Sequence, residues 1–159
     1  MEDGVKVKGT FRIVLTEDGF KVGDSGWVTN TVTNRGFEEY ITGLMVSDAN
    51  SNRVTHAALG TGAVAINATQ TLLTSELTHA AGARAAITAA TSSTSSRARY
   101  TATFASSDNF ITAQVTIGEV GLFQTSTTNA ATLGFGNTFT TSALATNQNV
   151  NLTYDIDFS

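Results

Sequence analysis

Apolar and polar residues alternate over two neighbouring stretches in the second half of the chain. In residues 96–105, Arg and Thr fall on one side and apolar residues on the other: Ala98, Tyr100, Ala102 and Phe104. Residues 111–123 carry apolar side chains at every second position until Gly118, where the phase changes. Alternation with period two is typical of a strand with one buried face. We expect these stretches to form one long central hairpin with a β-bulge at Gly118.

The same alternation marks both ends of the chain. Residues 5–15 predict one strand, followed by a hairpin turn signal at Glu17-Asp18-Gly19. Residues 150–158 alternate up to the last positions and predict a C-terminal strand. Shorter strands are expected over residues 54–59, 84–91 and 132–140.

A helical pattern begins after Asn34, which we interpret as the N-cap. Apolar residues follow at helical spacing: Phe37, Tyr40, Ile41, Leu44 and Met45. This pattern predicts an amphipathic helix over about residues 35–46 whose stripe lies on a sheet. A charge in place of Phe37 or Leu44 is therefore expected to unfold the domain. About residues 70–77 we expect a short second helix or an ordered loop.

Together these elements predict a mainly β fold. Seven or eight strands at regular spacing with one good helix are typical of an antiparallel β-sandwich or a jelly-roll-like arrangement. No second domain and no internal repeat is indicated, so we expect residues 1–159 to form a single domain.

Composition narrows the classes of function. Only 14% of the 159 residues are charged, and the formal net charge is −4. The lack of a basic cluster beyond Arg97 and Arg99 argues against binding of nucleic acid. No apolar run approaches the roughly 20 residues of a membrane span, so we expect no membrane partner. The chain has no cysteine, which excludes disulfides and thiolate metal sites.

The sequence offers little catalytic chemistry. His56 and His79 stand apart and belong to no metal-ligand pattern, and no serine nucleophile motif occurs. Gly60-Thr61-Gly62 lacks the remainder of a phosphate-binding loop, so we interpret it as a turn. Asp155 and Asp157 share one face of the last strand, where a solvated face is favoured over a calcium site. We expect no enzyme activity, no cofactor and no metal.

Glu119 is the most informative charged residue, because it lies between apolar residues at the expected bulge. A buried carboxylate needs a partner. The candidates are Arg84, Arg97 and Arg99, and we predict a structural ion pair between Glu119 and Arg84.

Several short motifs follow one another along nearly the whole chain: Glu17-Asp18-Gly19, Thr33-Asn-Arg-Gly36, Leu59-Gly-Thr-Gly62, residues 70–77, Arg84, residues 99–104, Glu119-Val-Gly-Leu-Phe123 and residues 150–158. In this order they resemble small virion structural proteins of tailed bacteriophages, which occur as capsid decoration proteins and as tail-fibre-associated domains. The resemblance implies a non-enzymatic, β-rich particle component, often a homotrimer.

Two functions follow from this resemblance as expectations. The first is a capsid decoration (cement) protein that binds the major capsid protein or other virion proteins, in a virion assembled in the host cytoplasm. The alternative is a tail-fibre or receptor-binding domain that recognises a host surface. The second function requires exposed aromatic side chains on loops, for which Trp27 and Phe110 are the candidates.

Overall fold

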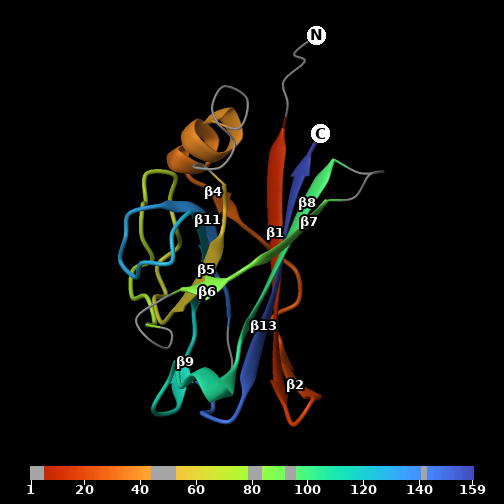
Figure 1. Ribbon diagram of the computed structural model, residues 1–159, viewed down its shortest axis with the longest axis vertical. Coiled ribbons are helices and arrows are strands. Elements are labelled where there is room, and N and C mark those ends of the chain that lie inside the picture. The colour runs from red at the N-terminus through yellow and green to blue at the C-terminus, as the bar shows by residue number, and fades with distance from the viewer. Residues whose placement is uncertain (1–5, 44–52, 79–83, 92–95, 141–142) are drawn as a thin grey trace.

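Two antiparallel sheets lie face to face in the computed structural model, which describes residues 6–43, 53–78, 84–91, 96–140 and 143–159. Sheet A contains the long strands from both ends of the chain, and sheet B contains shorter strands from its middle (Figure 1). Side chains of both sheets meet in the main hydrophobic core. The predicted antiparallel β-sandwich is therefore confirmed.

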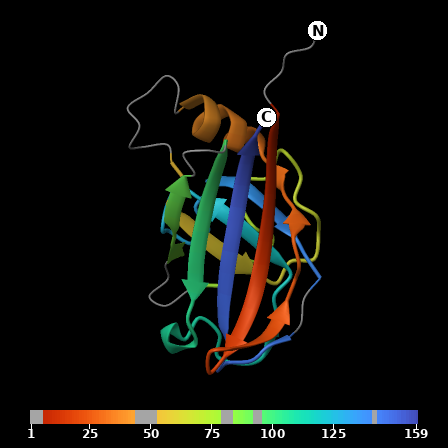
Figure 2. The same cartoon turned by 90° about the vertical axis from the view of Figure 1, so that its right-hand side faces the viewer.

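Sheet A has six strands, of which five follow the order β2-β1-β13-β8-β7, while β3 also pairs with β1. Figure 2 shows this sheet face-on. Its strands are β1 (Val7–Glu17), β2 (Phe20–Asp24), β3 (Val28–Thr29), β7 (Thr88–Thr91), β8 (Arg97–Phe104) and β13 (Asn149–Phe158). The strands β1 and β13 pair from Val7 opposite Phe158 to Thr16 opposite Asn149, which brings the two ends of the described chain side by side.

Sheet B has the order β4-β11-β10-β5-β6, and a separate two-stranded ribbon joins β12 to β9. The strands of sheet B are β4 (Thr31–Val32), β5 (His56–Gly60), β6 (Ala85–Ala86), β10 (Glu119–Phe123) and β11 (Leu133–Thr138). The ribbon consists of β9 (Val115–Thr116) and β12 (Ala143–Leu144). The strand predicted over residues 84–91 is thus divided between the two sheets.

Alternate side chains of β1 and β13 fill the space between the sheets. Phe11 stacks on Tyr154 with ring centroids 5.6 Å apart, and it meets Phe139 edge-on at 5.7 Å. Phe11 and Tyr154 are fully buried. Burial of each such ring contributes roughly 1.5–3 kcal/mol. The alternation predicted for both ends of the chain is confirmed.

The predicted central hairpin is wrong. β8 pairs with β13 and β7 in sheet A, whereas β10 pairs with β5 and β11 in sheet B. A 3₁₀ turn (Ser106–Asp108) and Asn109, with φ of 50°, follow β8 where the chain leaves sheet A. Asn tolerates this left-handed conformation better than most residues. Alternation along a strand indicates which of its faces is buried, but it does not indicate which other strand pairs with it.

Gly118 separates β9 from β10 instead of forming the predicted bulge. Its amide donates to the Gly60 carbonyl and its carbonyl accepts from the Phe139 amide, both at 2.9 Å. A Cβ at Gly118 would lie 2.5 Å from the Gly62 carbonyl oxygen, so the close approach of these backbones requires glycine. The apolar phase changes at this point because every residue of β10 is buried.

The predicted helix is present over residues 34–43, but it is not a regular α-helix. Its central part, η1 (Gly36–Ile41), is a π-helix. Thr33 caps it instead of Asn34, because the Thr33 hydroxyl accepts a 3.1 Å hydrogen bond from the Gly36 amide. A π-helix has i→i+5 hydrogen bonds, so a stripe derived from 3.6 residues per turn does not stay on one face.

Tyr40 is buried on this helix, whereas Phe37 is 44% exposed. The Tyr40 ring covers Gly134 of β11, and its hydroxyl donates to the Thr132 carbonyl. The prediction that Phe37 lies buried against a sheet is therefore wrong, and with it the reason to expect that a charge at this position unfolds the domain. Leu44 lies outside the described residues.

Candidate functional site

A long loop, residues 61–78, covers the outer side of sheet B as a third layer (Figure 1). A second buried cluster forms where this loop meets the sheet: Ala58, Ile66, Leu73, Phe123 and Leu133. Of the two structures expected for residues 70–77, the ordered loop is present and the short helix is not. The loop has no charged residue from position 61 to position 75, and Val64 on it is 67% exposed.

Glu119 is fully buried beneath this loop, but Arg84 is not its partner. Its Oε1 atom accepts hydrogen bonds from the backbone amides of Gly62 (3.1 Å) and Ser75 (2.7 Å). Its Oε2 atom accepts a bond of 3.0 Å from the Thr74 amide. The predicted Glu119–Arg84 ion pair is thus replaced by a carboxylate held by three amides. With both oxygens engaged, Glu119 holds the loop and is not placed to act as a general base.

Glycines make room for this carboxylate. A Cβ at Gly60 would lie 2.4 Å from Glu119 Oε1, and a Cβ at Gly62 would lie 2.6 Å from the same atom. The segment interpreted as a simple turn is thus one wall of the carboxylate site. A turn composition in the sequence does not reveal this role, because the carboxylate comes from a distant strand.

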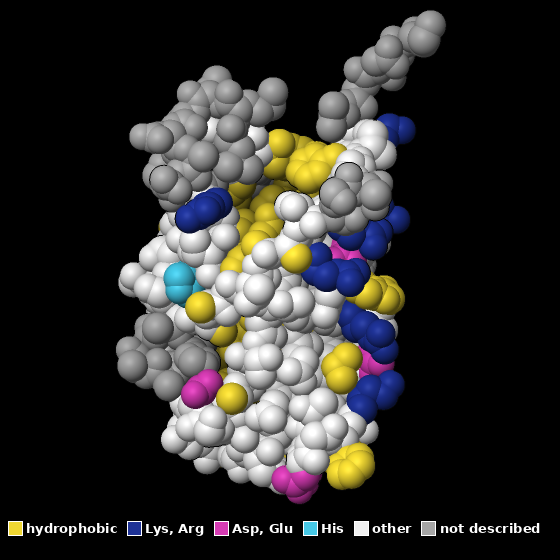
Figure 3. Space-filling view, turned by 45° about the vertical axis from the view of Figure 1, so that its right-hand side comes forward, with side chains coloured by type: hydrophobic (Ala, Val, Ile, Leu, Met, Phe, Trp, Pro, Cys, Tyr) yellow, Lys and Arg dark blue, Asp and Glu magenta, His cyan; other side chains and the backbone are white. Residues whose placement is uncertain are grey.

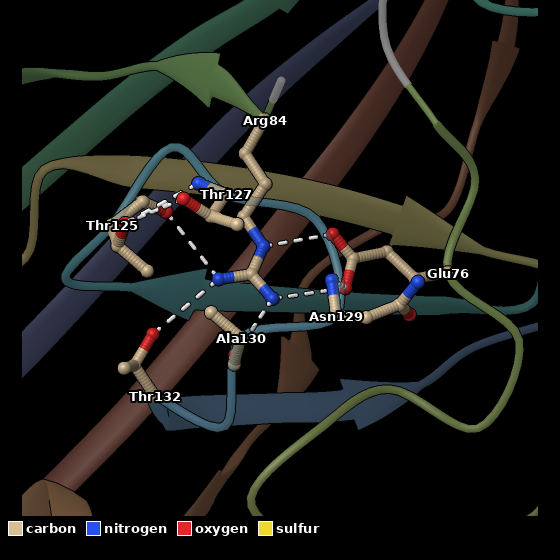
Figure 4. A network of polar contacts seen from close by, with 7 residues as sticks. All are labelled: Glu76, Arg84, Thr125, Thr127, Asn129, Ala130 and Thr132. Atoms are coloured by element: carbon tan, nitrogen blue, oxygen red, sulfur yellow. Dashed lines mark hydrogen bonds and ion pairs between the residues drawn. The ribbon is translucent and has the colours of Figure 1, made fainter. Parts of the chain in front are cut away.

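Arg84 pairs instead with Glu76 of the covering loop (Figure 4). Its Nε and Nη2 atoms donate to the two Glu76 carboxylate oxygens at 2.7 and 2.9 Å. The side chains of Arg84 and Glu76 are 1% and 0% exposed, and the guanidinium lies 3.5 Å from the centroid of the Phe123 ring. Arg84 also donates to the carbonyls of Thr125 and Ala130.

This network joins two loops across β10, because Arg84 reaches both the 61–78 loop and residues 125–132. Sequence reasoning missed Glu76 as the partner. The available signal was its separation of only eight positions from Arg84, together with the need of any buried guanidinium for a carboxylate.

His56 lies at the start of β5 and bonds to the preceding residue. The Thr55 hydroxyl donates to the Gln124 carbonyl at 2.6 Å, so the His56 Nδ1–H must donate to Thr55 across 2.8 Å. Burial, reinforced by the positive charge of Arg84, lowers the pKa of His56. His79 lies outside the described residues. Among the residues that the structure describes, no three His, Asp or Glu side chains gather into a group that could hold a metal.

Asp155 and Asp157 occupy ion pairs on the outer face of sheet A, not a calcium site. Arg99 donates to Asp155 through two bonds of 2.7 Å, and Arg97 Nε donates to Asp157 at 2.6 Å. Asp155 is 2% exposed, so the interpretation as a solvated face is wrong for this residue, whereas the Asp157 side chain is 31% exposed and remains partly solvated.

An open groove of about 530 Å³ lies between the edges of the two sheets, beside β3. Five hydroxyl side chains line it: Ser25, Thr61, Thr116, Thr138 and Thr140. None of the described residues that line the groove is ionisable. The groove can form hydrogen bonds with a polar ligand, but these residues provide no acid or base.

The two aromatic residues expected on loops behave differently. Trp27 is 51% exposed and lies next to the groove in sequence, between Ser25 and Val28. Phe110 is 5% exposed and packs on Phe104 with ring centroids 5.9 Å apart, so the expectation that it is available to a ligand is wrong.

Comparison of the chain with protein-family models, with curated proteins and with solved structures finds no match. None of the described helical residues forms a segment long and apolar enough to cross a membrane.

Proposed function

We propose that this chain is a virion structural protein of the tailed-phage kind, a capsid decoration protein that binds the outer surface of the head and stabilises it. The observation that carries the proposal is that the buried ionisable groups of the described residues serve to hold parts of the fold together. Among the described residues, Glu119, the Arg84–Glu76 pair and Asp155 each bond one loop or strand to another. Such bonds make a fold rigid, which suits an assembly component better than a catalyst.

The uncharged cover of sheet B supports the same proposal. Residues 61–75 present small and polar side chains around the exposed Val64, and such a surface can be buried against a partner without desolvating charges. The partners would be the major capsid protein or other virion proteins, and copies of the chain itself in a homotrimer.

Stabilisation of a head by this protein follows mass action. A ligand that binds only the assembled shell stabilises it by RT ln(1 + [L]/Kd), and many copies on one lattice multiply the effect. No step of this function needs catalysis or a cofactor. The chain would accumulate in virions assembled in the host cytoplasm.

The alternative is a tail-fibre or receptor-binding domain, and one observation favours it. Trp27 is exposed, and it lies in the sequence between Ser25 and Val28, which both line a groove rich in hydroxyl groups. An aromatic side chain next to hydrogen-bonding groups is a combination suited to a polar ligand such as a glycan.

Purified particles from cells that produce the protein separate the two functions. Antibody labelling locates the chain on the particle, and gel densitometry gives its ratio to the major shell subunit. A ratio near one with label over the head supports decoration. A far lower ratio with label on the tail supports the alternative, and a chain found only in the unassembled fraction overturns both.

A further inference from the structure

The outer face of sheet A carries most of the positive charge of the molecule. Six of the nine Lys and Arg residues lie there: Lys6, Lys8, Arg12, Lys21, Arg97 and Arg99. In the part of the chain that the structure describes, three acidic residues lie among them: Asp24, Asp155 and Asp157. Counted over the described residues, the face has a formal charge of +3, whereas the whole chain carries −4. Figure 3 shows the cationic side chains following one side of the molecule.

The arginines of this face are held in fixed positions by aspartates on neighbouring strands. Arg99 on β8 bonds through two nitrogens to Asp155 on β13, and Arg97 bonds in the same way to Asp157. A third pair joins β1 to β2. Side chains that are already ordered lose less conformational entropy when a partner binds.

Two lysines at the start of β1 add further positive charge to this ordered array. Lys6 and Lys8 are exposed, and neither forms an ion pair with another residue in the described part of the chain. Lys8 lies opposite Asp157 in the β1–β13 register, so it extends the row of charges that Arg97 and Arg99 begin.

We infer that the outer face of sheet A docks onto an acidic protein surface. The face alternates cations with three carboxylates, so it matches the separated carboxylates of an acidic protein surface better than the dense and uniform phosphates of nucleic acid or of an anionic membrane. The remaining side chains of β8 and β13 on this face are Thr101, Thr103, Asn149, Asn151 and Thr153, which offer hydrogen bonds but no aromatic ring for a base to stack on. The inference rests on the charge arrangement alone, so it goes beyond the proposed function and does not depend on it.

Binding of the full chain to immobilised poly-L-glutamate, measured by biolayer interferometry at low and moderate salt, tests the inference. Lys8→Glu is expected to weaken binding about fivefold or more, because it reverses a charge on the face. Arg53→Glu is the matched control, since it makes the same change in net charge at an exposed site outside sheet A. It is expected to change the affinity less than about twofold. Asp157→Asn should strengthen binding, because it removes a carboxylate from the face.

Equal weakening by Lys8→Glu and Arg53→Glu would overturn the inference, since net charge alone would then explain binding. So would an absence of binding to poly-L-glutamate, or tighter binding to a DNA duplex or to phosphatidylserine vesicles at the same salt. Circular dichroism of each variant confirms that it is folded. If Lys8→Glu does not fold, the comparison of Asp157→Asn with the unmodified chain decides the question, because unchanged or weaker binding contradicts docking through this face.

Discussion

The backbone amide of Ser75 donates a 2.7 Å hydrogen bond to the Oε1 atom of Glu119, which lies 44 positions later in the chain. The amides of Gly62 and Thr74 donate to the same carboxylate. Amides that converge on one anion reproduce the chemistry of a helix N-terminus in a loop that contains no helix. One buried side chain thus closes the 61–78 loop over sheet B.

Replacing Glu119 with Gln should lower the free energy of unfolding by about 2–4 kcal/mol. The substitution preserves size, but it removes the negative charge and turns an NH₂ group toward backbone donors. Urea unfolding followed by circular dichroism measures the change. Glu38→Gln, on the exposed side of the helix, is the control and should shift stability by less than about 0.5 kcal/mol. Equal effects of the two substitutions would show that the three amides do not stabilise the loop.

The Arg84–Glu76 pair should show strong coupling. Arg84→Met leaves the Glu76 carboxylate buried without its cation, which is expected to cost about 3–5 kcal/mol. Glu76→Leu alone leaves the guanidinium uncompensated and should cost a similar amount. The double variant should lose at least about 1 kcal/mol less than the sum of the single losses. Additive losses in urea unfolding would contradict the pair as the source of the stability.

Strands with one buried face could be predicted from the sequence, whereas a strand buried on both faces could not be oriented or paired. β1 and β13 have one buried and one solvated face, so alternation identified both and their inward residues. β10 is buried on both faces, so its apolar pattern carries no period that fixes an orientation. The false hairpin arose from this strand, because nothing local to residues 111–123 encodes pairing with β5 and β11.

For Glu119 the sequence indicated burial but not the partners, whereas for Asp155 it predicted a solvated face and the structure shows a buried carboxylate. The apolar neighbours of Glu119 correctly indicated a buried carboxylate that needs compensation. Its donors are backbone amides, and these have no signature in the sequence because every residue except proline carries one. The expectation that the chain has no enzyme activity and the expectation that it belongs to a virion are not tested by the fold. Both stay predictions.

Gly36→Ala should destabilise the protein, although helix propensity alone predicts a gain of about 1 kcal/mol. A Cβ at Gly36 would lie 2.2 Å from the carbonyl oxygen of Gly134, and a backbone atom in β11 cannot move away easily. We expect a loss of about 2 kcal/mol or more in urea unfolding. Thr42→Ala, at an exposed position of the same helix, should be neutral or slightly stabilising. A stabilised Gly36→Ala variant would mean that the helix does not rest on β11.

His56 should make the protein less stable in mild acid. Burial and the nearby Arg84 lower the pKa of His56 below its usual 6.5, so the folded state favours the neutral ring. Its contribution is fully present above the unfolded pKa and is lost as the pH falls from about 6.5 through the lower folded value. The effect should stay below about 1 kcal/mol, because the ring is partly solvated. The measurement is urea unfolding of the unmodified chain and of His56→Gln at several pH values between about 8 and 5. The two proteins have all other titrating groups in common, so the difference between them gives the contribution of His56 to the pH dependence of stability. The unmodified chain should lose more stability than His56→Gln over this range, and parallel pH profiles would show that the folded protein does not disfavour the charged ring.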